Sequence, residues 1–185
     1  MKEAYTHLAH LLQEHSFTKV LDLGAWKWYG SLLAASYRTT VDAVDNGSMG
    51  TRTPPAFILD HKYITYFQED ITSYLARYAG DPYDIIMMIN VLHFLWNNYL
   101  NDTLLPFFNK HLTSGWYAII NYYLADDPIF FSEENKHKHT AYSATDFTSL
   151  AWYTVVDSAE FWVDEVDKKS GEHQHHVGVV VMKKG

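Results

Sequence analysis

Cysteine is absent from the 185-residue sequence, and no uninterrupted apolar run reaches the roughly 18 residues that a membrane span needs. Without cysteine the chain has no disulfide, no cysteine-ligated zinc and no cysteine nucleophile. The sequence also has no internal repeat, low-complexity tract or long Gly/Ser linker. Its first residues, MKEAYTHLAHLLQEH, lack the apolar segment of a secretory signal, so we expect a cytoplasmic protein.

Basic residues are in the minority, because 14 Lys and Arg face 22 Asp and Glu and leave a net charge of −8. A surface of this sign repels phosphate groups, so we expect neither nucleic acid nor a membrane as partner. Apolar residues make up 48% and charged residues 19%, a globular balance that at this length predicts a single domain over residues 1–185. The 6 Trp, 14 Tyr and 10 Phe suit either a ligand pocket or a bulky core.

Hydrophobic patterning predicts alternating strands and helices. Apolar residues at helical spacing indicate an opening helix at Tyr5, Leu8, Leu11 and Leu12. Short apolar runs predict strands over 19–23, 40–44, 63–67, 83–89 and 116–123. Helices are predicted over 31–36, 73–78 and 101–111, with Ser31 near an N-cap and Gly115 ending the last helical region. The segment 47–55 is rich in helix breakers and predicts a loop, and we expect no regular helix over 47–61.

Two further apolar runs, 161–166 and 177–182, flank Ser170-Gly171 and predict an antiparallel hairpin. The alternation before them predicts a parallel sheet with helices on both faces. Right-handed crossovers then make the fold a doubly wound, Rossmann-like α/β sheet that is mostly parallel and ends in the hairpin. Such sheets bind ligands at the carboxyl ends of their strands, so the residues that follow each strand matter most.

Three carboxylates stand at the ends of the first three predicted strands. Asp22 precedes the Gly24 turn, Asp45 ends the second strand and Asp70 follows the third. Asp45 comes about 20 residues after Gly24, a spacing typical of an acid that accepts from ribose hydroxyls. Each aspartate alone is also explained by helix capping or strand termination. Three at successive strand ends favour a ligand that contains a nucleoside.

Four segments, VLDLGAWKWYGSLLAA, VDAVDN, FQEDI and YDIIMMINVLHFL, occur in an order that resembles the class I S-adenosylmethionine-dependent methyltransferases. The Asp126-Asp127-Pro128 segment and the stretch DEVDKKSGEHQHHVGVVVMKKG are similar to the tellurite-resistance methyltransferase branch. The resemblance implies a seven-stranded sheet whose last strand is antiparallel. It also implies S-adenosylmethionine as cofactor, S-adenosylhomocysteine as product and a small-molecule methyl acceptor.

Carried over by position, the resemblance implies ten cofactor-binding residues. Those around the methionine part are Asp22, Gly24, Ala25 and Trp26. Those around the adenosine are Asp45 for the ribose, Asn46 beside the adenine, Asp70 for its amine and the Ile71 backbone at the ring edge. Asn90 and Val91 face the sulfonium end. A nicotinamide dinucleotide is less favoured, because the G-x-G-x-x-G fingerprint is absent.

The loop after the first strand departs from the family where Trp26 and Trp28 replace glycines. Three explanations are open: a different loop path, an indole stacked on the adenine or the sulfonium, or indoles that fill the site. The last would leave a non-catalytic protein that binds a ligand or a partner, so this function stands as the alternative to methyl transfer. Lys27 in the same loop is a candidate partner for the cofactor carboxylate.

The acceptor side is predicted after the fourth strand. His93 is the best-placed candidate for a general base, although a packed histidine at a helix start is the favoured explanation. Four aromatic residues are candidates for the acceptor pocket, or else form part of the core: Phe94, Trp96, Tyr122 and Tyr123. A soft acceptor, such as a thiol or a reduced chalcogen species, needs no general base, whereas an alcohol or amine does.

Histidines at two-residue spacing, His137 with His139 and His173 with His175, share a face only if the chain is extended. No zinc-hydrolase motif accompanies them or His176, so we predict surface histidines and no metal. The Asp126-Asp127 pair is expected in a solvated turn.

Overall fold

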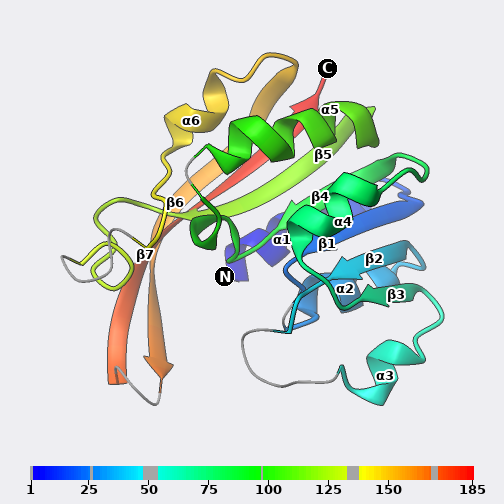
Figure 1. The fold of residues 1–185 in the computed structure, drawn as a ribbon, viewed down its shortest axis with the longest axis horizontal. Helices are drawn as coiled ribbons and strands as arrows, with labels where there is room; N and C mark the ends of the chain where they lie inside the picture. Colours follow the sequence, from blue (N-terminus) through cyan, green and yellow to red (C-terminus); the bar gives the residue numbers. More distant parts are fainter. Residues whose placement is uncertain (1, 26, 48–53, 97, 133–137, 168–170) are drawn as a thin grey trace.

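The computed structural model describes residues 2–25, 27–47, 54–96, 98–132, 138–167 and 171–185. One seven-stranded sheet, ordered β3-β2-β1-β4-β5-β7-β6, runs through the molecule (Figure 1). Its strands are β1 Lys19–Leu23, β2 Thr40–Val44, β3 Ile64–Phe67, β4 Tyr83–Met88, β5 Leu112–Tyr123, β6 Tyr153–Asp167 and β7 Gly171–Lys184. Neighbours from β3 to β5 pair in parallel, and β7 is antiparallel to both β5 and β6. The predicted mostly parallel sheet with a C-terminal hairpin is therefore confirmed.

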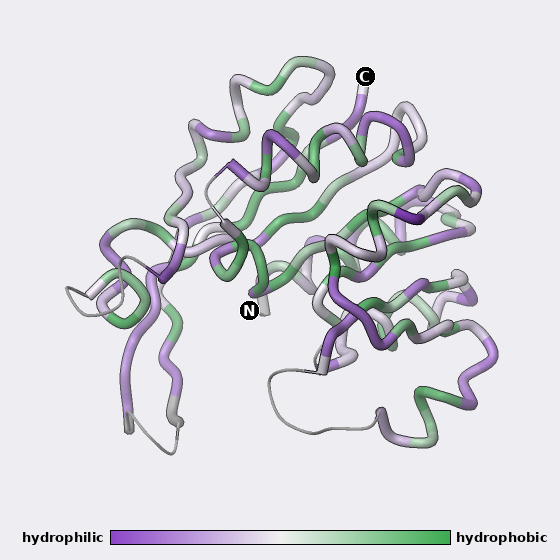
Figure 2. Tube along the Cα trace, in the orientation of Figure 1, coloured by the Kyte–Doolittle hydropathy of each residue, from purple (hydrophilic) through white to green (hydrophobic). Residues whose placement is uncertain are grey.

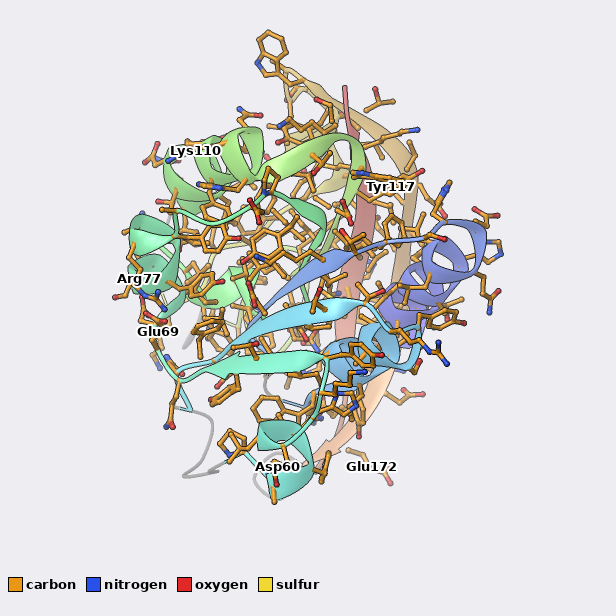
Figure 3. All side chains as sticks on the ribbon, turned by 90° about the vertical axis from the view of Figure 1, so that its right-hand side faces the viewer. Asp60, Glu69, Arg77, Lys110, Tyr117 and Glu172 are labelled. Carbon is orange, nitrogen blue, oxygen red and sulfur yellow. The ribbon has the colours of Figure 1, made fainter. Side chains whose placement is uncertain are left out.

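Helices cover both faces of this sheet. They are α1 Lys2–Glu14, α2 Tyr29–Ser36, α3 Ala56–Leu59, α4 Ile71–Arg77, α5 Leu105–His111 and α6 Ala144–Thr148, with the short helices η1 Leu92–Phe94 and η2 Leu100–Leu104. Figure 3 shows α4 and α5 on one side of the strands and α1 on the other. Side chains of α1, α2 and α3 belong to one buried cluster, and those of α4, α5 and α6 to the other.

Strand periodicity divides the core between these two layers. In β1, Val20 packs toward α1 and α2, whereas Leu21 and Leu23 pack toward α4 and α5. Every residue of β4 is buried, as expected for a central parallel strand covered on both faces. Figure 2 shows hydrophobic central strands, whereas the outer part of β7, which extends beyond the helices, is hydrophilic. The hairpin end therefore stands apart from the main core.

Three local predictions differ from the structure. Helix α2 begins at Tyr29, two residues before the predicted start, so Ser31 is a fully buried residue of its first turn. The last predicted helix ends at His111, and Gly115 lies within β5 with φ +83°, beside an irregularity in the β4–β5 pairing. The short helix α3 lies inside the segment 47–61, where no regular helix was expected; it begins just after Pro55. Proline is tolerated there because the first helical N–H groups need no intrahelical acceptor.

None of the described helices is long and apolar enough to cross a membrane.

Candidate functional site

A cleft of about 590 Å³ opens at the carboxyl ends of the parallel strands. Residues that follow β1, β2, β3 and β4 form one side of the cleft, and the β6–β7 hairpin contributes to the other. The sheet order reverses between β1 and β4, since β2 and β3 lie on one side of β1 and β5 on the other side of β4. This is the switch point at which doubly wound sheets bind their ligands.

Seven of the ten predicted cofactor residues line this cleft: Gly24, Asp45, Asn46, Asp70, Ile71, Asn90 and Val91. Of the other three, Trp26 lies outside the described residues, and Asp22 and Ala25 are buried beneath the cleft at 4% and 3% exposure. The parallel register places the ends of β1, β2 and β4 side by side, which is why residues far apart in the sequence meet here.

Asp22 holds the start of α2 instead of lining the cleft. Its Oδ2 accepts a hydrogen bond of 2.6 Å from the Ser31 hydroxyl, and the Ser31 backbone N–H also donates to the carboxylate. Trp28, at the N-cap position, provides no side-chain cap, so Asp22 satisfies an amide that the helix leaves without a partner. Burial raises the pKa of Asp22 to about 6; the Ser31 hydrogen bonds oppose this shift and the Asp45 carboxylate adds to it.

The loop after β1 takes a path that only glycine can begin. Gly24 has φ +78°, and a Cβ atom there would lie 1.9 Å from Cγ2 of Val91. Trp28 also adopts a left-handed conformation, with φ 60°, which costs a non-glycine residue about 1–3 kcal/mol. Its indole packs edge-on against Tyr66 of β3 at 5.0 Å and does not line the cleft. For Trp28, an altered loop path is the explanation that the structure supports.

The two aspartates at the adenosine side differ in their contacts. Asp45 is partly buried, and its Oδ1 accepts from the Gly47 N–H at 2.7 Å. Burial raises the pKa of Asp45, and this hydrogen bond opposes the shift. Asp70 caps α4, because its Oδ1 accepts from the backbone N–H groups of Thr72 and Ser73. A carboxylate has two oxygens, so capping by Oδ1 is compatible with a ligand contact through Oδ2.

His93 lies in an aromatic cluster at the other end of the cleft, only 1% exposed. Its ring centroid is 3.9 Å from that of Phe94, 4.3 Å from Tyr123 and 4.4 Å from Phe130. Neither of its ring nitrogens has a hydrogen-bond partner among the described residues. Burial above all, then the nearby His139, lowers the pKa of His93 to about 3. The imidazole is therefore neutral near pH 7 and a weak base there.

Two of the four aromatic residues predicted for the acceptor pocket, Phe94 and Tyr123, line the cleft, whereas Trp96 and Tyr122 do not. Tyr122 is fully buried against Phe147 of α6, with ring centroids 5.0 Å apart. Neighbouring residues on a strand point to opposite faces, so Tyr122 and Tyr123 cannot both reach the cleft. Trp96 is 52% exposed and its indole packs edge-on against Tyr99.

The hairpin side of the cleft carries residues that the sequence analysis assigned to the surface. His175 is 4% exposed, and its Nδ1 lies 2.9 Å from Oδ2 of Asp127, which is itself 1% exposed. The predictions of a surface histidine and of a solvated Asp127 are therefore wrong. His173 and Glu165 line the cleft beside His175. The two-residue spacing of His173 and His175 in the sequence indicated that they share a face of a strand. No sequence signal pointed to Glu165, which lies beside them only because β6 pairs with β7 in this register.

His176 and the second hollow lie apart from this cleft. His176 binds Asp126 through Nδ1 at 2.6 Å, and His137 lies outside the described residues. A second hollow of about 470 Å³ lies between η2 and α6, and none of the predicted site residues lines it.

Comparisons with known proteins establish the class of the fold. No protein-family model matches the sequence, and no curated protein matches it. Solved structures do match, and the fold that they share with this chain is that of the class I S-adenosylmethionine-dependent methyltransferases. The fold predicted by the resemblance is therefore confirmed.

Three of these structures illustrate the likeness. TehB from Haemophilus influenzae matches 97% of this chain with a TM-score of 0.74 and 18% identity, and the chain spans 62% of the length of TehB. The N-methyltransferase NodS from Bradyrhizobium japonicum WM9 matches 99% of the chain and 95% of its own length, with a TM-score of 0.66 and 18% identity. The 1,6-didemethyltoxoflavin-N1-methyltransferase from Burkholderia thailandensis, with bound 1,6-didemethyltoxoflavin and S-adenosylhomocysteine, matches 98% of the chain and 78% of its own, with a TM-score of 0.67 and 16% identity.

Proposed function

We propose that the protein binds S-adenosylmethionine in this cleft and transfers its methyl group to a small-molecule acceptor. The observation that carries the proposal is the convergence of Asp45, Asp70 and Asn90, from three different strand ends, on one cleft at the switch point of the sheet. Two of the solved structures with this fold, NodS and the toxoflavin methyltransferase, contain S-adenosylhomocysteine. That ligand is the product expected from the cofactor proposed here.

The polar groups of the cleft fit such a cofactor. The partly buried Asp45 carboxylate is an acceptor suited to the two adjacent ribose hydroxyls. The Oδ1 atom of Asn90 is a buried acceptor without a partner among the described residues, and the Asn90 backbone is held by a 3.1 Å bond to Oδ1 of Asn121. A buried acceptor of this kind is costly unless a ligand donor satisfies it. Lys27 lines the same cleft and supplies a positive charge for a ligand carboxylate.

The bound cofactor supplies a methyl carbon that is activated by a positively charged sulfur. The protein's part is to hold an acceptor in line with that carbon, which contributes several kcal/mol to catalysis. The aromatic cluster around His93 forms an apolar wall for the acceptor and excludes water. His93, neutral and weakly basic, serves as a hydrogen-bonding group to the acceptor, not as a strong proton acceptor. This favours a soft acceptor such as a thiol or a chalcogen species.

Calorimetry with S-adenosylmethionine and S-adenosylhomocysteine tests the cofactor. We expect micromolar binding of both, weakened about 10–100-fold in Asp45→Ala, because a charge-assisted hydrogen bond contributes about 1.5–3 kcal/mol. Asp60→Ala is the matched control, since this aspartate is exposed at the end of α3 (Figure 3) and does not line the cleft. If neither ligand binds at millimolar concentration, the alternative of a non-catalytic binding protein replaces the enzyme.

A panel of acceptors tests the second half of the proposal. The protein is incubated with S-adenosylmethionine and a thiol, a selenol, an amine or an alcohol of similar size, and S-adenosylhomocysteine formation is measured. We expect turnover with the thiol and the selenol. Turnover confined to the amine or the alcohol would contradict the soft acceptor while leaving the methyltransferase function intact.

A further inference from the structure

We propose that Glu165, His173 and His175 form a binding site for a divalent transition-metal ion, represented best by Zn²⁺, on the hairpin side of the cleft. The three side chains place one ligand atom each within 4.8 Å of one another. The proposal is independent of methyl transfer and goes beyond it. It also revises the prediction of no metal. That prediction rested on the spacing of the histidines along the sequence and took no account of the strand pairing in the hairpin.

The β6–β7 pairing brings the three residues to one face. His173 and His175 are two positions apart on β7, so both point to the same side of the strand. Glu165 of β6 pairs directly with His173, and directly paired residues also share a face. This face is turned to the cleft, because all three residues line it. His176, on the opposite face of β7, stacks on Trp162 instead, with ring centroids 4.4 Å apart.

The distances between the ligand atoms suit a single ion. Nε2 of His175 lies 3.1 Å from Nε2 of His173 and 3.7 Å from Oε2 of Glu165. Tetrahedral zinc with bonds of about 2.0–2.1 Å to nitrogen places its ligand atoms about 3.3–3.4 Å apart. These two distances bracket this value, and all three ligand atoms lie within 4.8 Å of one another, so side-chain rotations bring them to one ion.

Asp127 orients the central ligand. Its Oδ2 accepts from Nδ1 of His175 at 2.9 Å, which puts the imidazole proton on Nδ1 and leaves the Nε2 lone pair facing His173 and Glu165. Asp127 is fixed in turn by the backbone N–H groups of Ile129 and Phe130, at 3.0 and 2.8 Å. Metal-binding histidines commonly have a carboxylate in this position, and it also makes the imidazole a stronger ligand.

The surroundings of the site favour a cation. The phenyl ring of Phe130 stacks on the His175 ring with centroids 5.1 Å apart, and Tyr123 covers its edge at 5.2 Å, so water is excluded from one side. Glu165 and Asp127 bring carboxylates that a divalent ion neutralises. Two imidazoles and one carboxylate are the donors of zinc sites that keep a coordination position open. Because the ligand atoms face the cleft, the open position takes water or a donor atom of the molecule bound there.

Metal titration of the 185-residue chain tests the site. The protein is stripped with a chelator, and Zn²⁺ is added in competition with a chromophoric chelator and without any methyl donor. We expect one tightly bound equivalent, weakened at least about tenfold in Glu165→Gln and in His173→Ala and about 10–100-fold in Asp127→Asn. His176→Ala is the matched control, since His176 lies on the same strand and faces the other way, and it should bind Zn²⁺ as the wild type does.

Co²⁺ in place of Zn²⁺ provides a second measurement, because its visible absorption reports the ligands around the ion. We expect a spectrum that changes in Glu165→Gln, a variant of a partly exposed residue that circular dichroism should show to be folded. The proposal is overturned if the folded protein takes up no stoichiometric Zn²⁺, which would mean that the two histidines merely share a hydrogen bond. It is equally overturned if His176→Ala weakens binding as much as His173→Ala. Neither result bears on the calorimetry of S-adenosylmethionine, so the two proposals fail separately.

Discussion

Replacing Asp22 by Asn should make the protein more stable at neutral pH, which is unusual for a carboxylate that accepts two hydrogen bonds. Burial at 4% exposure raises the pKa of this carboxyl from 3.8 to about 6 in the folded chain. Well below pH 3.8 the acid is protonated in both folded and unfolded chains, and the shift costs nothing. As the pH rises, the Asp22 carboxyl ionises first in the unfolded chain. The free energy of unfolding therefore falls until this carboxyl has ionised in the folded chain too.

The full cost follows from the size of the shift. Roughly two pH units at 1.36 kcal/mol each give about 3 kcal/mol of lost stability above pH 7. In Asp22→Asn the amide keeps the volume of the side chain, and its oxygen still accepts from the Ser31 hydroxyl, but it cannot ionise. The difference in unfolding free energy between variant and wild type should therefore grow in the variant's favour by about 2 kcal/mol from pH 4.5 to pH 7.5.

Urea unfolding followed by tryptophan fluorescence measures this difference, with unfolding free energies obtained by linear extrapolation at both pH values. Asp60→Asn, at an exposed position, is the control and should follow the wild type at both. Equal destabilisation of Asp22→Asn at pH 4.5 and 7.5 would refute the reasoning, because it would mean that Asp22 is ionised in the folded chain at both pH values.

Two further predictions concern the cleft itself. Gly24→Ala should cost about 1–3 kcal/mol more than Gly115→Ala, because both glycines have positive φ but only a Cβ at Gly24 meets another side chain, that of Val91. Chemical denaturation of both variants checks this, and equal losses would contradict the close contact. His93→Phe should raise the unfolding free energy by about 1–3 kcal/mol, because it removes two buried nitrogens without partners among the described residues. The same variant should lower methyl transfer, and a loss of stability would show that the nitrogens are satisfied in solution.

The sequence predicted the sheet well because the signals for its strands are local. The bounds of β1 and β2 agree with the predicted 19–23 and 40–44, since each is a short apolar run that ends at a breaker or an acid. The same locality placed Asp45 and Asn90 at strand ends, and parallel pairing then brought both to one cleft. The sequence also predicted helix capping as one of two interpretations of Asp70, the other being contact with a ligand.

The errors arose where a residue's role depends on which way its side chain points. Tyr122 and Tyr123 are equally aromatic, and only the packing of α6 decides that Tyr122 faces away from the cleft. Asp22 stands at a strand end as Asp45 does, yet it is covered by the first turn of α2 and bonded to Ser31. Because side chains alternate along a strand, neighbouring residues point to opposite faces of the sheet. The alternation does not indicate which of the two faces the cleft.

The amino-acid sequence by itself determined the order of strands and helices, the sheet edge at which the cleft opens and most of the polar residues along that edge. These depend on hydrophobic period and on breakers within a few residues. Only the tertiary structure joined His175 to Asp127, 48 residues away, and brought Glu165 opposite His173. Such contacts are set by the register of the hairpin and by burial against other segments, which no local pattern encodes.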